Sequence, residues 1–426
     1  MKLWDNKNST NQKIIEFTVG NDRSYDLHLI KYDIKASISH AKMLYKSNLL
    51  TEIECNKILD ILKKMLDEAN AGKLKIENEF EDMHSKIEYL LIKKLGDTGK
   101  KIHTARSRND QVLVSIQLYL INELTQIKKE VKSLFDLLII LAKKNKDAIM
   151  PGYTHMKAAM PSSFGLWFSA FAEILIDDII SLNSTIKIVN QNTLGSAAGY
   201  GTSFNIDRNF TTKDLNFLTL KYNSLACQIS RNKIEKNTFD TLGNIAFTLS
   251  KISMDICLYL GDEFQFISFP DDITTGSSIM PHKKNPDVFE IIRGKCNNIQ
   301  NLSNSISLSS TNLPSGYHRD FQLNKGKIID AVIEIKECIK ILSYCLSKIK
   351  VNKKILEKSN YENIFSVELI NEMVMQGIPF RDAYLKLKNK LSEEKINVPK
   401  KVNYSHIGSI GNLALDKIKL KMKENY

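Results

Sequence analysis

The sequence predicts an all-α protein in which an elongated central helical bundle carries smaller helical domains at its N-terminal and C-terminal ends. Apolar residues recur every three or four positions over long stretches, the spacing that gives a helix one apolar face. Gly and Pro gather in short segments between these stretches. Alternation of apolar and polar residues, typical of a half-buried strand, is hard to find. An antiparallel helical bundle follows from this pattern.

The chain of 426 residues and 48.6 kDa is larger than one hydrophobic core usually supports, so several domains are expected. Residues 1–106 have a mixed helical pattern and form the predicted N-terminal domain. Residues 107–350 contain the long apolar periodicities and form the predicted central bundle. Residues 351–426 are more polar and form the predicted small C-terminal helical domain.

Long helices account for most of the predicted bundle. The stretch 100–150 contains neither Gly nor Pro and has apolar residues at helical spacing, which predicts one long helix. The same rhythm at 242–259 and 328–349 predicts two more. Shorter helical patterns begin near Ser162 and Pro286. The irregular segments between these helices are where functional residues tend to lie.

The composition excludes several classes of protein. Lys and Arg exceed Asp and Glu by 60 to 48, but the lysines are interleaved with other residues, so a solvated surface is expected and a nucleic-acid partner is not. Six scattered cysteines, with no pair at two-residue spacing, indicate a reducing compartment and no zinc site.

Neither a membrane span nor a signal peptide is expected. The opening MKLWDNKNST lacks the apolar stretch of a signal peptide. The longest apolar run, 137–142, is far below the roughly 20 residues that a spanning helix needs. We expect a cytoplasmic protein without a membrane partner.

The stretch TTGSSIMPHKKNPDVFE, residues 274–290, has the chemistry of a loop that closes over an anion. Gly276 permits unusual backbone angles, Lys283 supplies a positive charge and Asn285 supplies amide donors. A helix predicted to begin at Pro286 adds positive potential at the same place. A surface loop with solvated lysines is the alternative that the residues alone leave open.

Within this stretch, GSSIMPHKKNP resembles the signature loop of the fumarase/aspartase superfamily of lyases. The resemblance implies that Ser277 takes a proton from the substrate and that Lys283 and Asn285 stabilise the carbanion that forms. An ordinary hydroxyl is a very weak base, so its alkoxide must be stabilised by Lys283 or by backbone amides. His282 departs from the Gln found in many argininosuccinate lyases.

The segment HTARSRNDQ, residues 103–111, is similar to the argininosuccinate lyase version of the superfamily's first signature region. Ser107, Arg108 and Asn109 form a polar cluster able to bind a carboxylate through a hydroxyl, a guanidinium and an amide. Helix capping by Ser107 or Asn109 is the alternative.

A second signature, PGYTHMKAAMP at residues 151–161, resembles the family segment that binds a carboxylate and transfers a proton. The resemblance assigns the first role to Thr154 and the second to His155, with Glu290 as the partner of the histidine. Lys157 and Met160 replace residues that are often glutamine in the family.

A third segment, YHRDFQLNK at residues 317–325, resembles the part of the family that grips the amino-acid end of the substrate. The matching positions are Tyr317, Gln322 and Lys325. In EDMHSKIE, residues 81–88, Asp82 and His84 either line the site or have a capping role. The segment RNKIEKNTFDT, residues 231–241, departs from the family pattern, and no site residue is predicted there.

Together these resemblances imply argininosuccinate lyase, a carbon–nitrogen lyase of arginine biosynthesis that reversibly cleaves argininosuccinate into arginine and fumarate. No metal and no organic cofactor are expected, because the carbanion charge can spread into the adjacent carboxylate. The alternatives are an adenylosuccinate lyase-like or other fumarate-releasing lyase, against which HTARSRNDQ argues, and a catalytically idle family member.

Helix length predicts a site shared between chains. At 1.5 Å per residue, a continuous helix from Asp110 to Ala148 would be about 57 Å long. Arg108 and His155 would lie at its opposite ends, too far apart for one small substrate. The homotetramer of the family, with sites assembled from several chains, satisfies this constraint. A break near residue 145 is the alternative.

Overall fold

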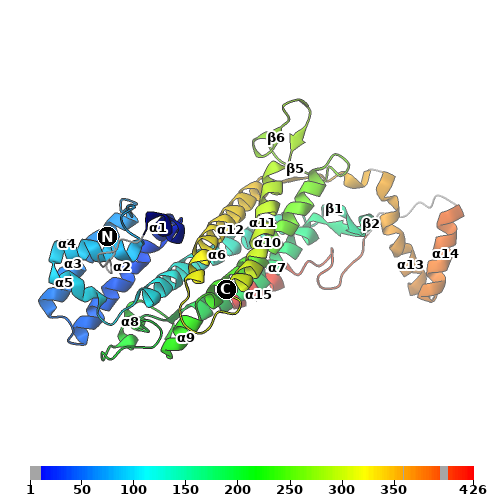
Figure 1. Ribbon diagram of the computed structural model, residues 1–426. Coiled ribbons are helices and arrows are strands. Elements are labelled where there is room, and N and C mark those ends of the chain that lie inside the picture. The colour runs from blue at the N-terminus through cyan, green and yellow to red at the C-terminus, as the bar shows by residue number, and fades with distance from the viewer. Residues whose placement is uncertain (1–10, 358, 394–401) are drawn as a thin grey trace. The chain divides into compact units, whose positions relative to one another are not determined.

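The computed structural model describes residues 11–357, 359–393 and 402–426 (Figure 1). The opening MKLWDNKNST, used above to argue against a signal peptide, lies outside these residues. Helices dominate, so the predicted all-α class is confirmed. Two compact units are present, and each draws on three separate stretches of the chain. Of the described residues, unit 1 comprises those within 11–128, 181–244 and 298–335, and unit 2 comprises those within 129–180, 245–297 and 336–426.

Unit 1 begins with a set of helices that precede the bundle. They are α1 (Gln12–Val19), α2 (Asp22–Lys46), α3 (Glu52–Asn70), α4 (Met83–Leu95), α5 (Asp97–Lys100) and the 3-10 turn η1 (Lys101–His103). Helix α3 starts with a capping box in which Thr51 and Glu54 satisfy each other's backbone N–H groups. The buried apolar residues of α2, including Leu29, Ile34 and Leu44, form part of the core of this unit.

Five long helices follow at the places that the apolar periodicity predicts. They are α6 (Arg108–Lys144), α7 (Phe164–Val189), α10 (Lys233–Leu260), α11 (Asp287–Ser309) and α12 (Leu323–Ser347). Helix α6 is shorter than the predicted 100–150, because Ala105 has a left-handed φ of 57° before it and a turn follows Lys144. In the described part of the chain, no helix has both the length and the apolar character needed to cross a membrane.

Side-chain hydrogen bonds join neighbouring helices within each unit. In unit 1, the hydroxyls of Thr185 on α7 and Thr241 on α10 are 2.7 Å apart. In unit 2, Asp178 on α7 accepts from Thr248 on α10 at 2.9 Å, and Trp167 Nε1 on α7 donates to Asp255 on α10 at 2.9 Å. These buried polar contacts hold the two helices in register, because an unsatisfied partner in the core would be costly.

An antiparallel hairpin in unit 2 was not expected from the sequence. Strands β1 (Ile149–Thr154) and β2 (Lys157–Ser163) pair from Ile149↔Ser163 to Thr154↔Lys157, with an irregularity after Gly152. The sequence predicted no strand in this segment, and that prediction was wrong. Pro151 and Gly152 in β1 and Pro161 in β2 mask the alternating pattern that identifies a strand.

The remaining elements are short and connect the long helices. They are β3 (Gln191–Asn192), α8 (Arg208–Asp214), β4 (Thr219–Leu220), α9 (Ser224–Ile229), β5 (Ile267–Ser268), η2 (Asp271–Ile273), β6 (Thr275–Gly276), β7 (Lys284–Asn285), η3 (Arg319–Gln322), β8 (Lys350–Val351), η4 (Ile355–Glu357) and η5 (Ser359–Phe365). The C-terminal part of unit 2 adds α13 (Ser366–Met375), α14 (Phe380–Glu393) and α15 (Leu415–Asn425). The division into 1–106, 107–350 and 351–426 stays a prediction.

The buried carboxylate of Asp110 ties the first turn of α6 to the glycine-containing loop after α7. Its Oδ2 accepts the backbone N–H groups of Gly195 and Ala197, both at 3.0 Å, and its Oδ1 accepts that of Ser107 at 2.9 Å. Gly195 and Ala197 have left-handed φ angles of 85° and 51°. Burial raises the pKa of Asp110 to about 6, against the opposing effect of the three donors. This loop and the start of α6 therefore depend on one side chain.

We predict that Asp110→Ala lowers the free energy of unfolding by about 3 kcal/mol, because it leaves one buried and two partly buried N–H groups without this acceptor. Chemical denaturation at fixed protein concentration measures the change. Asp136→Ala is the matched control on the same helix, since Asp136 pairs with Lys132 at the surface, and its cost should stay below about 1 kcal/mol. Equal losses in the two variants would contradict the role of Asp110.

Candidate active site

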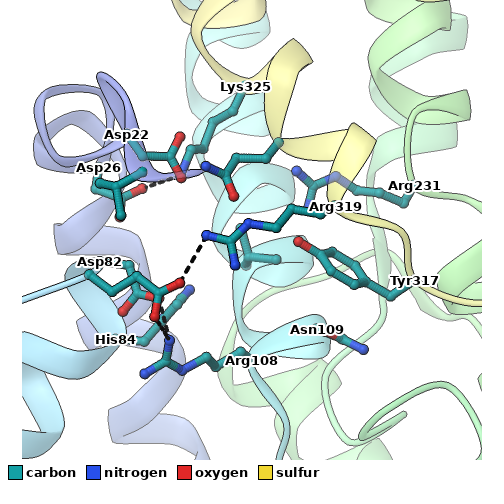
Figure 2. Close-up of a pocket in the computed structure, with 14 residues that line it drawn as sticks. Asp22, Asp26, Asp82, His84, Arg108, Asn109, Arg231, Tyr317, Arg319 and Lys325 are labelled. Carbon is teal, nitrogen blue, oxygen red and sulfur yellow. Dashed lines mark hydrogen bonds and ion pairs between the residues drawn. The ribbon is translucent and has the colours of Figure 1, made fainter. Parts of the chain in front are cut away.

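A cavity of about 180 Å³ in unit 1 brings together residues from helices α1, α2, α4, α6 and α12, from the 3-10 turn η3 and from connecting segments (Figure 2). It is lined by Val19, Asp22, Asp26, Glu81, Asp82, His84, Arg108, Asn109, Val112, Arg231, Tyr317, Arg319, Gln322 and Lys325. Most of these side chains are charged or polar, with both signs present. The cavity is below the usual 300–1,000 Å³ range of ligand pockets and suits one end of a polar molecule.

Three charged residues at one side of the cavity form a buried triad. Asp22 and Asp26 lie one turn apart on α2, and Lys325 lies in the first turn of α12. The Lys325 Nζ is 2.8 Å from Asp22 Oδ2 and 2.6 Å from Asp26 Oδ1. Burial alone would lower the pKa of Lys325, but the two carboxylates outweigh it and hold that pKa above its ordinary value. Lys325 is therefore a charged group held by two acids.

Asp82 begins α4 and also contacts the cavity. Its Oδ1 accepts the Ser85 backbone N–H at 2.8 Å, which caps the helix, and its Oδ2 accepts from Arg108 Nη1 at 2.8 Å. Burial would raise the pKa of Asp82, but His84 and Arg108 outweigh this effect and lower it. Asp82 therefore both caps α4 and lines the cavity, the two roles considered from the sequence.

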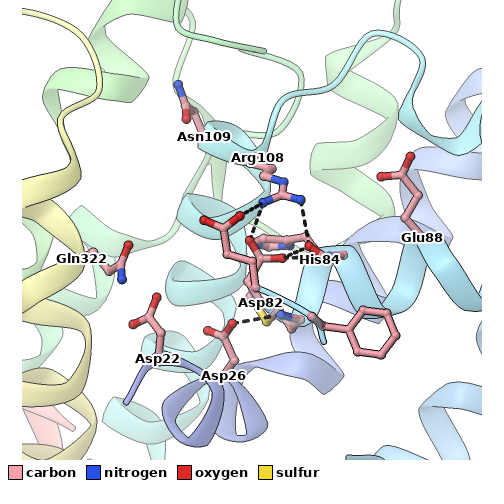
Figure 3. A network of polar contacts seen from close by, with 12 residues as sticks. Asp22, Asp26, Asp82, His84, Glu88, Arg108, Asn109 and Gln322 are labelled. Atoms are coloured by element: carbon pink, nitrogen blue, oxygen red, sulfur yellow. Dashed lines mark hydrogen bonds and ion pairs between the residues drawn. The ribbon is translucent and has the colours of Figure 1, made fainter. Parts of the chain in front are cut away.

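Glu81 links two of the arginines that line the cavity, and Figure 3 shows one of them, Arg108, close to Asp82. Arg319 Nη2 donates to Glu81 Oε1 at 2.9 Å, and Arg108 Nη1 is 3.4 Å from Glu81 Oε2. Arg108 also donates to the Ser85 hydroxyl at 2.8 Å. The guanidinium of Arg108 is thus held in one orientation by three neighbouring groups.

His84 reaches the cavity from a buried pair with Asp33. The His84 Nδ1 is 3.0 Å from Asp33 Oδ2, and both side chains are almost completely buried. Burial would lower the pKa of His84, but the Asp33 carboxylate outweighs it and raises that pKa. The Asp33 carboxylate thus favours the positively charged form of His84, whose charge in turn acts on Asp82.

Five residues predicted to bind substrate lie around this cavity: Arg108, Asn109, Tyr317, Gln322 and Lys325. Ser107 instead caps α6, because its Oγ accepts the Asn109 backbone N–H at 3.2 Å. Gln322 Nε2 donates to the Thr18 carbonyl at 2.9 Å. The segments 107–109 and 317–325, far apart in the chain, therefore meet in unit 1.

Five charged cavity residues were missed from the sequence: Asp22, Asp26, Glu81, Arg231 and Arg319. Asp22 and Asp26 have the four-residue spacing of one helix face, and Arg319 lies inside YHRDFQLNK, so a signal existed for these three. Arg231 lies in the segment set aside because it departs from the family pattern. It forms a buried ion pair with Glu235 at 2.8 Å.

The other predicted residues lie in unit 2, where a small hairpin presents the GSSIMPHKKNP loop. Strands β6 and β7 pair through Thr275↔Asn285 and Gly276↔Lys284, so Ser277 and Lys283 share one connecting loop. The Ser277 Oγ accepts the backbone N–H of Met280 at 3.1 Å and lies 3.4 Å from that of Ile279. Two amide dipoles therefore point at this hydroxyl oxygen.

Glu290 lies in the first turn of α11 and is exposed, as is Lys283. Thr154 and His155 are at the tip of the β1–β2 hairpin, where His155 and Met156 have left-handed φ angles of 51° and 59°. Within the described residues, no hydrogen bond or ion pair joins His155 to Glu290. Their pairing stays a prediction.

The hairpin that carries His155 is anchored by Tyr153. Its ring packs against Phe264 with centroids 5.5 Å apart, and its hydroxyl donates to that of Tyr361 at 3.2 Å. The described part of the chain contains no group of three His, Cys, Asp or Glu side chains arranged to hold a metal ion.

Comparisons with known proteins agree with the family resemblance of the sequence segments that carry the predicted site residues. The family model described as "Lyase" matches residues 11–301. The argininosuccinate lyase of Phocaeicola vulgatus is 48% identical over 423 residues, covering 99% of this chain and 95% of that protein. The argininosuccinate lyase of Thermotoga neapolitana is 40% identical over 395 residues, covering 92% of this chain and 99% of that protein.

Solved structures support the fold. The structure of EDDS lyase in complex with formate has a TM-score of 0.80 at 20% identity, covering 98% of this chain and 91% of that one. A class II fumarase from Schistosoma mansoni has a TM-score of 0.72 at 17% identity, covering 90% and 93%. With near-complete coverage by the sequence relatives, the chain belongs to the argininosuccinate lyase family, within the larger lyase family whose model it matches.

Proposed function

We propose that the chain cleaves argininosuccinate reversibly into arginine and fumarate, as a carbon–nitrogen lyase of arginine biosynthesis in the cytoplasm. The observation that carries this proposal is the 48% identity to an argininosuccinate lyase over 423 residues, with HTARSRNDQ present in the chain. A catalytically idle relative would be expected to have lost site residues, and here Ser277, Lys283 and His155 are all present. The adenylosuccinate lyase-like alternative is not favoured.

The first step is removal of a proton from the carbon next to a substrate carboxylate, with Ser277 as the base. A hydroxyl performs this step only if its alkoxide is stabilised. The N–H groups of Met280 and Ile279 directed at Ser277 Oγ favour the ionised form. Lys283, in the same loop, adds a positive charge, which exclusion of water would strengthen.

The carbanion spreads its charge into the adjacent carboxylate, and the resulting dianion needs positive potential around it. Lys283, Asn285 and the N-terminus of α11 supply it. The carbon–nitrogen bond then breaks, its electron pair goes to the guanidino nitrogen of the arginine product, and the double bond of fumarate forms. His155, oriented by Glu290, takes part in protonating the leaving nitrogen.

The polar cavity of unit 1 binds the rest of the substrate. Tyr317, Gln322 and Lys325 hold the amino-acid end, and Arg108 and Asn109 face the same space. Ser107 and Thr154 complete the set of proposed substrate contacts. No organic cofactor takes part in the proposed reaction.

The test is to incubate the purified protein separately with argininosuccinate, adenylosuccinate, malate and aspartate while following fumarate absorbance. Fumarate from argininosuccinate alone, with arginine released in equal amount, is the expected result. Turnover of another substrate in preference, or of none, would overturn the proposal.

Ser277→Ala should lower kcat about a thousandfold or more while leaving substrate affinity largely unchanged, because it removes the base and none of the binding groups. Single-turnover kinetics and calorimetric binding measure the two effects separately. Ser278→Ala, at the neighbouring exposed serine, is the matched control and should keep most of the activity. Near-normal turnover by Ser277→Ala would exclude Ser277 as the base.

A homotetramer with shared sites is part of the proposal. Helix α6 is continuous over 37 residues, which corresponds to about 55 Å, and the predicted site residues divide between the segments that flank its two ends. In unit 2, apolar side chains are exposed on the bundle helices: Ile174 on α7, Phe247 and Met254 on α10, and Ile291 on α11. Such surfaces favour association with further copies of the chain.

Mixing Ser277→Ala with His155→Asn, followed by dissociation and reassembly, should restore activity. If a site takes Ser277 and His155 from different chains, random mixing leaves about a quarter of the sites without either lesion. The fumarate assay measures the recovery, and each variant reassembled alone is the control. No recovery in demonstrably mixed oligomers, or a fully active monomer in sedimentation, would contradict the shared site.

A further inference from the structure

A second cavity of unit 1, with a volume of about 300 Å³, lies between the start of α10, the end of α11 and the loop that leads into η3. This volume is at the lower end of the range usual for ligand pockets. None of the residues assigned to the proposed reaction lines the second cavity. It therefore has room for a small ligand and no part in the chemistry proposed above.

In the described part of the chain, the charged side chains that line the second cavity are all basic: Arg231, Lys233 and Lys236. Two of them have an acidic partner that does not line it. Arg231 Nε is 2.8 Å from Glu235 Oε1, and Lys236 Nζ is 2.8 Å from Asp240 Oδ2. Lys233 is exposed, and its ammonium group has no hydrogen bond or ion pair with any other described residue. When ionised, the five side chains have a net positive charge, and the unpaired charge is that of Lys233.

Two almost completely buried side chains of the second cavity have hydrogen-bond donors that are not used. Gln228 is 1% exposed and Arg231 is 5% exposed. Within the described ranges, neither Gln228 Nε2 nor Arg231 Nη1 has an acceptor. A buried donor without an acceptor is costly, so a ligand that brings acceptor atoms into this space is favoured.

Apolar side chains form another part of the lining: Ile229, Ile306, Leu313 and Phe321. Ile306 and Phe321 are buried, Leu313 is half-buried and Ile229 is exposed. A hydrocarbon group in contact with them gains free energy in proportion to the apolar surface that leaves water. A hydrated inorganic ion makes no use of this surface. The lining therefore fits an anion with a short hydrocarbon body better than it fits inorganic phosphate.

We infer that the second cavity binds a small organic carboxylate, with its charge at Lys233 and its hydrocarbon body against the apolar side chains, and that this ligand weakens substrate binding in the first cavity. Arg231 lines both cavities, and Figure 2 shows it together with Tyr317 and Arg319 at the first one. An anion in the second cavity therefore lies within the length of one side chain of the first.

The direction of the coupling follows from charge. Argininosuccinate has three carboxylates and two cationic groups, so it is a net anion, and two anions bound close together repel each other. The effect is reciprocal, because each ligand lowers the affinity for the other by the same factor. The effect on the substrate rests on the proposed function, whereas binding of the carboxylate does not.

The first test measures binding of three probes by calorimetry: hexanoate, its neutral analogue hexanamide, and inorganic phosphate. The wild-type protein should bind hexanoate at least about tenfold more tightly than either of the others, because hexanamide lacks the charge and phosphate lacks the hydrocarbon body. Absence of saturable hexanoate binding would overturn the inference, and so would equal or tighter binding of hexanamide or phosphate. These results need no variant to fold.

Two variants locate the binding site. Lys233→Gln removes the unpaired charge and should weaken hexanoate binding about threefold or more, the range of an exposed ion pair. Leu313→Asp places a negative charge in the apolar wall and should weaken it about tenfold or more. Lys57→Gln, at an exposed lysine on α3, is the matched control and should bind hexanoate as the wild-type protein does. Unchanged hexanoate binding by both Lys233→Gln and Leu313→Asp would place the ligand elsewhere and overturn the inference.

The second test measures turnover of argininosuccinate at increasing hexanoate concentrations. KM should rise about threefold or more and then level off, because both ligands can be bound at once, whereas a competitor for the first cavity raises KM without limit. Lys233→Gln should keep the KM measured without hexanoate and should need about threefold more hexanoate for half of the effect. An unlimited rise in KM, or no rise at hexanoate concentrations that saturate binding, would overturn the inference and leave the proposed lyase activity intact.

Absence of turnover would overturn the proposed function without deciding the role of the second cavity. Calorimetry then decides it, by titration of hexanoate with and without argininosuccinate. Weaker binding of hexanoate in the presence of argininosuccinate is the expected result, and equal binding would overturn the inferred coupling.

Discussion

The carboxylate of Asp26 is the contact on which the cavity of unit 1 depends. It stands on α2, accepts the Met83 N–H at the start of α4 and accepts the ammonium of Lys325 at the start of α12. Three helices from distant parts of the sequence are thereby joined at one buried group. A buried charge is costly unless it is paired and hydrogen-bonded, and each oxygen of Asp26 has a partner. The orientations of Lys325 and of the segment that carries Glu81 and Asp82 follow from this contact.

Around Asp26, acidic and basic side chains alternate in the network that lines the cavity. Arg108 lies between Asp82 and Glu81, and Glu81 lies between Arg108 and Arg319. In this part of the network each charge has neighbours of opposite sign, which lowers the cost of removing these groups from water. A bound substrate exchanges some of these pairs for its own charged groups, which costs less than stripping water from isolated ions.

The fold was largely predictable from the sequence, because the apolar stripes of the long helices are strong local signals. The 107–109 and 317–325 segments were also recognised, and the structure brings them to one cavity. Asp22 and Asp26 were missed because two acids four residues apart look like an ordinary solvated helix face until α12 buries them. The β1–β2 hairpin was missed because Pro and Gly interrupt its alternation. The predicted roles of Ser277, His155, Lys283 and Glu290 remain predictions, since a sequence does not specify which atoms of different chains meet.

The way in which the two units are built has a consequence for how the chain folds during synthesis. Unit 1 needs residues up to 335, and unit 2 needs residues up to 426, because each is assembled from three separate stretches. Individual helices form early from local contacts, but unit 1 cannot complete its core before the residues up to 335 are synthesised, and unit 2 completes its core later still. The apolar faces of helices such as α6 and α7 therefore stay exposed until the helices that pack against them are synthesised. Nascent chains of this protein are expected to need protection from aggregation over most of their elongation time.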